Sequence, residues 1–146
     1  MTGGAAVIVA ALFTWFGMVL AISFVEAPLK FRAPGVTLRI GLGIGRLVFR
    51  ALNTMEVFLA LAIIVATVAD TPPPGATAAI AVAIAALAVQ MVAVRPRLSR
   101  RSDAVLAAPT AAEGPTKRSR AHYVYVGLEL VKVVALLLGG ILMLPT

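Results

Sequence analysis

Four long apolar runs alternate with more polar connections along the chain, at about residues 5–25, 47–69, 76–94 and 123–144. Each run has roughly 19 to 23 residues, and at about 1.5 Å per residue a helix of that length crosses a hydrocarbon core of about 30 Å. Transmembrane β-strands would alternate polar and apolar positions, which these runs do not. The pattern therefore predicts an all-α membrane protein, with one transmembrane domain of four helices over residues 1–146.

The connections predict how these helices follow one another. The short turn DTPPPG at residues 70–75 should make the second and third spans antiparallel neighbours, which favours an up-down-up-down bundle. The third span is rich in alanine, so we expect it to be packed on at least two sides. The first span carries a stripe of small residues at helical spacing that could support close helix contact, namely Ala10, Thr14, Gly17 and Ala21.

The two longer connections, residues 26–46 and 95–122, contain prolines that predict breaks in helical structure. Pro28 and Pro34 lie in the first of these connections, and Pro109 and Pro115 lie in the second. The second connection is polar and poor in aromatic residues, so we expect it to be flexible or bound to a surface.

Composition excludes several classes of protein. The chain is 61% hydrophobic and 13% charged with a mean hydropathy of +1.02, whereas a soluble domain has about 25% charged residues. It has no cysteine and one histidine, which excludes a disulfide framework, a cysteine nucleophile and a Cys/His zinc site. No catalytic triad, metal-ligand spacing or nucleotide-binding motif is present, so we expect no catalytic residues, no metal site and no cofactor.

Charge predicts the orientation in the membrane. The net charge is +7; four of the 13 Lys and Arg residues lie in connection 26–46, seven lie in connection 95–122, and the turn at 70–75 has none. The positive-inside rule then places both basic connections in the cytoplasm and both termini outside, as in a multi-pass protein of the cell inner membrane. Basic residues in this arrangement favour contact with membrane lipids, and we expect no binding to nucleic acid.

Ionisable and polar residues inside the spans are candidates for function, because they are costly to place in lipid. The candidate intramembrane polar cluster comprises Glu26, Arg50, Asn53, Glu56, His122, Tyr125, Glu129 and Lys132, and Gln90 lies late in the third span. All of these lie toward the predicted cytoplasmic ends, which favours a pocket open to the cytoplasm over a through-pore.

Two interpretations of this cluster stay open. In the first, it handles a cation, a proton or an amine. In the second, which we favour, it consists of interhelical ion pairs: Glu56 with Arg50 or Lys132, and Glu129 with Lys132 or Arg46.

The segment between the first two spans offers a further candidate site. The backbone N–H groups that open the second span, together with basic side chains, could hold a lipid phosphate, with candidate contacts Lys30, Arg32, Arg39 and Arg46. The alternative, which we favour, is an amphipathic turn whose apolar side chains dip into the lipid interface. The run GLGIGR is not a dinucleotide fingerprint, because no strand precedes it and its glycine spacing differs.

The run SFVEAPLKFRAPGVTLRIGLGIGRLVFRALN, residues 23–53, resembles a group of uncharacterised small bacterial four-helix membrane proteins. In these, an acidic residue, proline and phenylalanine follow the first helix, and a Gly-Arg-hydrophobic-Phe motif opens the second. That group is similar to the copper-resistance type of membrane domain. The resemblance implies a bundle fold and no particular chemistry, and copper handling is not expected because the chain has no cluster of His or Met.

These features favour a non-catalytic accessory or scaffold subunit of a larger inner-membrane complex, packed through small-residue helix faces and a basic cytoplasmic loop. The partners would be larger membrane subunits or further copies of the chain. The alternative is a small oligomeric binding or transport protein that handles a proton, cation or lipid through the polar cluster. A membrane enzyme that uses carboxylates as acid and base ranks lowest.

Overall fold

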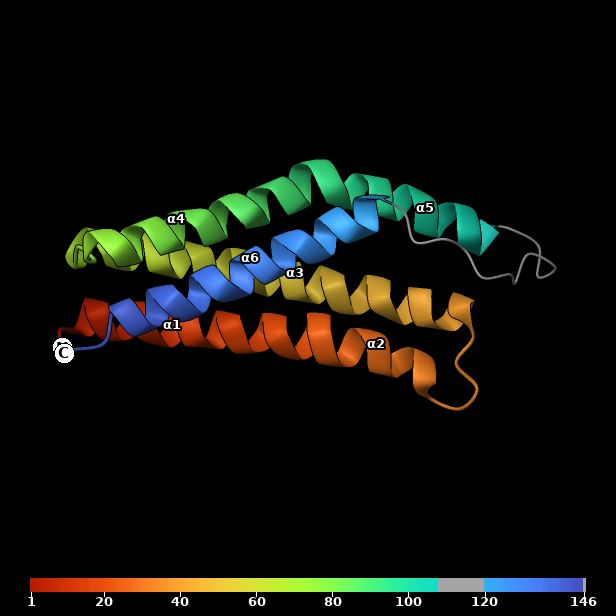
Figure 1. The fold of residues 1–146 in the computed structure, drawn as a ribbon, viewed down its shortest axis with the longest axis horizontal. Helices are drawn as coiled ribbons and strands as arrows, with labels where there is room; N and C mark the ends of the chain where they lie inside the picture. Colours follow the sequence, from red (N-terminus) through yellow and green to blue (C-terminus); the bar gives the residue numbers. More distant parts are fainter. Residues whose placement is uncertain (108–119, 146) are drawn as a thin grey trace.

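The computed structural model describes residues 1–107 and 120–145 of the chain. Four rods in it are long and apolar enough to cross a membrane: Gly3–Arg32, Leu38–Ala69, Pro74–Ala107 and Arg120–Leu142. Successive rods run in opposite directions and lie alongside one another (Figure 1). No strand occurs in the described ranges, so the prediction of an all-helical chain with four long apolar helices is confirmed.

Two of the rods are composite. The first consists of α1 (Gly3–Val19), a π-helical segment η1 (Leu20–Glu26), α2 (Ala27–Leu29) and a 3₁₀ turn η2 (Lys30–Arg32). The second rod is a single helix, α3 (Leu38–Ala69), and the fourth is α6 (Arg120–Leu142). The third rod joins α4 (Pro74–Val89), a second π-helical segment η3 (Gln90–Val94) and α5 (Arg95–Ala107).

Helical structure extends well beyond the predicted spans at the start of the second rod and at the ends of the first and third rods. The α3 helix begins at Leu38 because the Thr37 hydroxyl accepts a hydrogen bond from Ile40 N at 3.2 Å, which caps the free N–H groups of the first turn. Residues 95–107, expected to be irregular, form helix α5 instead. Pro109 and Pro115 lie outside the described residues.

The α5 helix is held against the start of α3. The Arg39 guanidinium donates to the Leu106 carbonyl at 2.7 Å, and Arg46 forms an ion pair with Asp103. These two polar contacts hold α5 in place, because α5 buries no side chain of its own. The pattern of apolar residues in the sequence does not predict them.

Packing is unequal among the four rods. The α1 helix packs on α3 and α6, and α4 packs on α6, whereas α3 and α4 touch sparsely although a short turn joins them. The α4 helix buries one stripe of residues, including Ala76, Ile80, Ala83 and Leu87, so within the described chain it is packed on one side. The expected packing on a second side stays a prediction. The contact of α4 with α6 is close because Gly139 faces Ala79, where an added Cβ would lie 3.3 Å from the Ala79 Cβ.

The turn between α3 and α4 is fastened to α1 instead. The Asp70 carboxylate accepts a hydrogen bond from Ala5 N at 3.0 Å, and Gly4 leaves room for the Asp70 side chain. A carboxylate at a helix N-terminus is favoured by the free N–H groups and the helix dipole. This contact ties the C-terminal end of α3 to the N-terminal end of α1.

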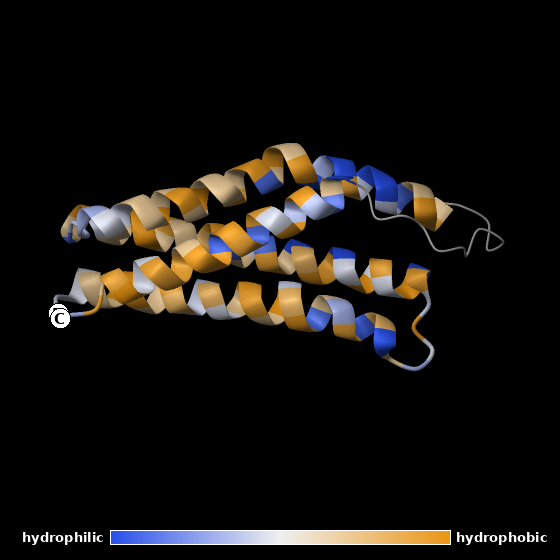
Figure 2. Cartoon of the chain, in the orientation of Figure 1, coloured by the Kyte–Doolittle hydropathy of each residue, from blue (hydrophilic) through white to orange (hydrophobic). Residues whose placement is uncertain are grey.

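Polar and apolar residues are distributed unevenly along the bundle. The hydrophilic residues gather at the end formed by α2, α5 and the start of α3, which we call the basic end, while the opposite half is almost uniformly apolar (Figure 2). The apolar core of that half is formed by fully buried side chains, among them Ile8, Leu12, Ile63 and Leu136.

Candidate functional site

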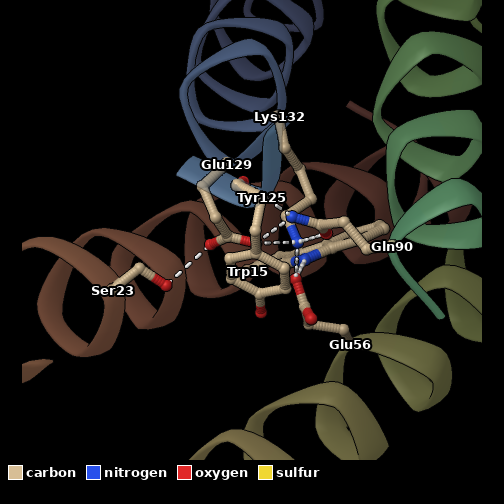
Figure 3. Close-up of polar contacts among 7 residues, drawn as sticks. All are labelled: Trp15, Ser23, Glu56, Gln90, Tyr125, Glu129 and Lys132. Carbon is tan, nitrogen blue, oxygen red and sulfur yellow. Dashed lines mark hydrogen bonds and ion pairs between the residues drawn. The ribbon is translucent and has the colours of Figure 1, made fainter. Parts of the chain in front are cut away.

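A buried polar cluster lies near the middle of the bundle, centred on the ammonium group of Lys132 (Figure 3). Lys132 Nζ lies 2.5 Å from Glu56 Oε1, 2.7 Å from Glu129 Oε1 and 2.7 Å from Gln90 Oε1. An ammonium group has three donors, and each finds an oxygen acceptor here. These groups come from α3, from η3 and from α6 itself, so one cation joins three rods.

Glu129 has partners on both of its carboxylate oxygens. Its Oε1 also accepts a hydrogen bond from Gln90 Nε2 at 2.6 Å, and its Oε2 accepts one from the Ser23 hydroxyl at 2.6 Å. The carboxylate therefore takes donors from the first, third and fourth rods. Three donors thus surround one buried carboxylate.

Glu56 is less evenly satisfied. Its Oε1 accepts the ammonium of Lys132 and, at 2.8 Å, the indole N–H of Trp15. Its Oε2 is buried and has no hydrogen-bond partner among the described residues. The two oxygens of this carboxyl group thus have different environments, which distinguishes Glu56 from Glu129.

Both π-helical segments bring a residue into the cluster. Ser23 lies in η1, and Gln90 is the first residue of η3. Each segment ends two residues before a proline, Pro28 or Pro96, and each closes with an i→i−5 hydrogen bond, from Ala27 N to the Ile22 carbonyl or from Arg95 N to the Gln90 carbonyl.

The wider π turn accommodates a proline ring that would otherwise meet the carbonyl of the preceding turn. The sequence predicts a break at Pro28, but this prediction is wrong, because the helical chain continues through Pro28 to Arg32. Ser23 and Gln90, which lie on these two π-helical segments, both donate hydrogen bonds to Glu129 in the interior.

Like Glu56 Oε2, two other buried polar atoms have no hydrogen-bond partner among the described residues: Asn53 Oδ1 and the Tyr125 hydroxyl oxygen. Asn53 lies three residues before Glu56 on α3, on the same helix face. The Phe49 ring lies with its centroid 5.8 Å from that of Tyr125, and Glu56 pairs with Lys132. The two residues on α3 are seven positions apart, and so are their two partners on α6. Asn53 therefore occupies the level between these two contacts.

Three of the predicted cluster members lie elsewhere. Glu26 pairs with Lys30 at 3.3 Å near the basic end, and Arg50 is exposed on α3. His122 lies at the start of α6, half-buried, with its ring 6.0 Å from that of Tyr123. The structure brings together Asn53, Glu56, Tyr125, Glu129 and Lys132, and the Glu56–Lys132 and Glu129–Lys132 pairs occur as the structural interpretation predicts.

Sequence reasoning missed Trp15 and Ser23 and left Gln90 out of the cluster. Trp15 lies in an apolar run and is fully buried, which is what a core aromatic does. The position of Gln90, a lone amide in an alanine-rich span, was the signal that could have found it, because a polar side chain there needs a partner.

Three of the four predicted lipid-phosphate contacts have partners within the chain. Lys30 extends over the Phe31 and Phe49 rings at 5.6 and 5.4 Å, and Arg39 and Arg46 hold α5. Arg32 is exposed at the end of the first rod. Gly41 and Gly45 of GLGIGR provide close approach, since an added Cβ would lie 2.2 Å from the Phe31 ring on Gly41 and 3.0 Å from Lys30 Nζ on Gly45, whereas Gly43 has nothing within 4 Å.

The small-residue stripe of α1 faces outward. Ala10, Thr14, Gly17 and Ala21 are all exposed, and the buried face of α1 carries Ile8, Leu12, Trp15 and Val19 instead. The α4 helix has a second such stripe, which comprises the exposed residues Ala78, Ala81, Ala85 and Ala88. Val7 on α1 and Val82 and Val89 on α4 are also exposed.

The outward faces of the other two long helices carry many more large side chains. They expose large apolar side chains, including Phe58, Leu61 and Val65 on α3 and Leu130, Leu138 and Ile141 on α6. Large aliphatic groups suit contact with lipid chains, whereas small residues allow another helix backbone to approach closely. The surface therefore offers two faces that fit a further helix and two that fit lipid.

Within the described ranges, no group of three or more His, Asp or Glu side chains is placed to hold a metal ion. The two surface grooves, between α1 and α3 and between α4 and α6, are lined by apolar residues. The polar chemistry of the described chain is concentrated in the buried cluster and at the basic end.

No protein-family model, curated protein or solved structure matches the chain. The resemblance of residues 23–53 to the small four-helix membrane proteins therefore stays a prediction.

Proposed function

We propose that the chain is a non-catalytic accessory or scaffold subunit of a larger complex in the cell inner membrane, with its basic end in the cytoplasm. The observation that carries this proposal is the contrast between the small-residue outer faces of α1 and α4 and the large-residue outer faces of α3 and α6. In lipid, helices associate through close packing and hydrogen bonds, and small residues permit that contact.

The interior supports the same role. The buried acidic and basic side chains bind one another and tie all four rods together, so the bundle holds its shape while α1 and α4 remain free to receive other helices. The surface grooves are apolar, so they offer a polar substrate no hydrogen-bond partners.

Exchanging alanine for leucine on the α4 stripe tests the proposal. We expect Ala81→Leu and Ala85→Leu to reduce the amount of partner subunit recovered with the tagged chain in mild detergent by about tenfold. Overpacking a close interface costs about 1–3 kcal/mol, and about 1.4 kcal/mol corresponds to a tenfold change in binding. The measurement is quantitative mass spectrometry of the purified assembly.

The matched control is Ala62→Leu, the same exchange at an exposed alanine on α3. It should leave the assembly unchanged, because it adds a large side chain to a face that already carries them. Recovery of the wild-type chain as a stable monomer without any partner, or equal assembly of all three variants, would contradict the proposed role.

A second candidate function is favoured by the unpartnered polar atoms of the cluster. In this alternative the protein is a small, oligomeric binding or transport protein that handles a proton, cation or lipid. The buried carboxylates outnumber the buried ammonium group, and Glu56 Oε2, Asn53 Oδ1 and the Tyr125 hydroxyl remain available for a ligand. The apolar grooves offer nothing to a lipid headgroup, so a proton or cation fits this cluster better.

A further inference from the structure

The buried cluster contains one more acid than base. Glu56, Glu129 and Lys132 are at most 1% exposed, so two carboxyl groups share one ammonium group away from water. Leaving a net charge in such a place is costly, and a buried group commonly changes its protonation state instead. One added proton makes the cluster neutral.

The hydrogen bonds indicate which carboxyl group takes this proton. Three of the four carboxylate oxygens accept donors: both oxygens of Glu129, and Oε1 of Glu56. Glu56 Oε2 accepts none. A carboxylate oxygen with no donor is the position where a proton replaces a missing hydrogen bond.

Two further buried polar atoms near the cluster also lack a partner among the described residues. Asn53 Oδ1, 2% exposed as a residue, is a buried acceptor without a partner, and the Tyr125 hydroxyl can donate or accept. Asn53 lies one helical turn before Glu56 on α3, and Tyr125 lies one turn before Glu129 on α6. We propose that Glu56 holds one exchangeable proton on Oε2. This deepens the second candidate function and does not depend on the accessory role.

The charged and polar groups that face Glu56 come from every element packed against it. They are Lys132 and Glu129 from α6, Gln90 from η3 and Trp15 from α1. The positive charge of Arg95, half-exposed at the start of α5, interacts electrostatically with Tyr125. In the neutral state Glu56 is a carboxylic acid, Glu129 is a carboxylate and Lys132 is an ammonium group. Loss of the proton leaves both carboxylates ionised.

Polar side chains lie between the cluster and the basic end. Tyr125 lies nearer the basic end than Lys132 does, and Phe49 separates it from Lys30. On the opposite side the bundle is filled by Ile8, Leu12, Ile63 and Leu136, all fully buried. The described bundle lacks the continuous polar path that conduction requires, so the geometry is that of a binding site whose polar side faces the basic end.

The chain carries its own reporter for the test. Trp15 is its one tryptophan, and its indole N–H donates to Glu56 Oε1 at 2.8 Å. With the full chain in lipid nanodiscs, we expect Trp emission to change in a single step as pH is raised. The infrared absorption of a protonated carboxylic acid should disappear over the same range. Glu56→Gln should lose both signals.

The matched control is Glu26→Gln, which makes the same exchange at the carboxylate that pairs with Lys30 near the basic end; both signals should persist. Glu56→Asp covers the case in which the glutamine variant does not fold, because it keeps an acid and should shift the infrared band. An unshifted band in Glu56→Asp, a band retained in folded Glu56→Gln, or no such band in the wild type would overturn the proposal.

Sodium is tested in the same preparation by replacing NaCl with choline chloride. A midpoint of the Trp step that is the same in both salts supports a proton as the ligand. A midpoint that moves with the sodium concentration would assign the site to a metal cation and overturn the proposal.

Discussion

At the residue scale, a single ammonium group links the rods of the described bundle through polar contacts. Lys132 binds Glu56 of α3 and Gln90 of η3, and Glu56 in turn binds Trp15 of α1. Lipid gives no hydrophobic force between helices, so such hydrogen bonds contribute specifically to which helices associate. The cluster should therefore determine the register of all four rods.

Removing this ammonium group should destabilise the fold. Lys132→Met leaves two buried carboxyl groups without their shared cation, and breaking a buried ion pair in this way costs about 3–5 kcal/mol. We expect the variant to unfold at a lower temperature and at a lower denaturant concentration than the wild type. Circular dichroism of the purified chain in detergent measures both.

The triple variant Lys132→Met/Glu56→Gln/Glu129→Gln separates charge from packing. Since replacing a whole buried ion set is often neutral, we expect it to recover part of the stability lost in Lys132→Met. A triple variant no more stable than Lys132→Met would show that the uncompensated charge is not the cause of the loss.

The polar cluster was partly predictable from the sequence. Glu129 and Lys132 are three residues apart on one apolar helix, and Glu56 is an isolated acid in another, so pairing among them follows from the cost of burying charge. Trp15 and Ser23 were not predictable, because an aromatic residue and a serine in an apolar run have ordinary roles. Their places in the polar cluster depend on the register between the rods and, for Ser23, on the π-helical segment η1.

At the element scale, glycine determines how closely α6 approaches its neighbours. An added Cβ on Gly140 would lie 2.8 Å from the nearest atom of the Phe13 ring on α1, and Gly139 has Ala79 of α4 beside it. Gly127, on the same helix, has nothing within 4 Å. Gly139 and Gly140 therefore allow close helix packing, whereas Gly127 does not take part in it.

Matched alanine exchanges should separate these roles. Gly140→Ala should lower the free energy of unfolding by about 1–3 kcal/mol, because it overpacks the contact with Phe13. Gly127→Ala should leave stability unchanged or raise it by up to about 1 kcal/mol, because alanine favours helix. Chemical unfolding in detergent followed by circular dichroism checks both, and equal effects of the two exchanges would contradict the packing of α1 on α6.

The number of long helices was predictable from the apolar runs, but their ends were not. The start of α3 depends on the Thr37 cap, and the passage of the first and third rods through Pro28 and Pro96 depends on π turns that open just before each proline. Hydropathy records neither feature, because both are backbone hydrogen-bond arrangements. The packing order of the rods also depends on tertiary contacts such as the one between Asp70 and Ala5.

At the scale of the whole molecule, charge is divided between the two ends. The basic residues of α2, α5 and the start of α3 gather at one end (Figure 2), and the ionisable side chain described at the other end is Asp70. A chain with this distribution should enter the membrane with its basic end in the cytoplasm. The accessory role and the sidedness of the proton site both depend on that orientation.

The absence of cysteine from the sequence allows this orientation to be measured directly with single cysteines. Thr71→Cys and Ala104→Cys place exposed thiols at the two ends of the bundle, and a membrane-impermeant maleimide is added to intact bacterial cells or spheroplasts that express each variant. We expect Thr71→Cys to be labelled in intact cells and Ala104→Cys only after the membrane is opened. Labelling of Ala104→Cys in intact cells would contradict the account.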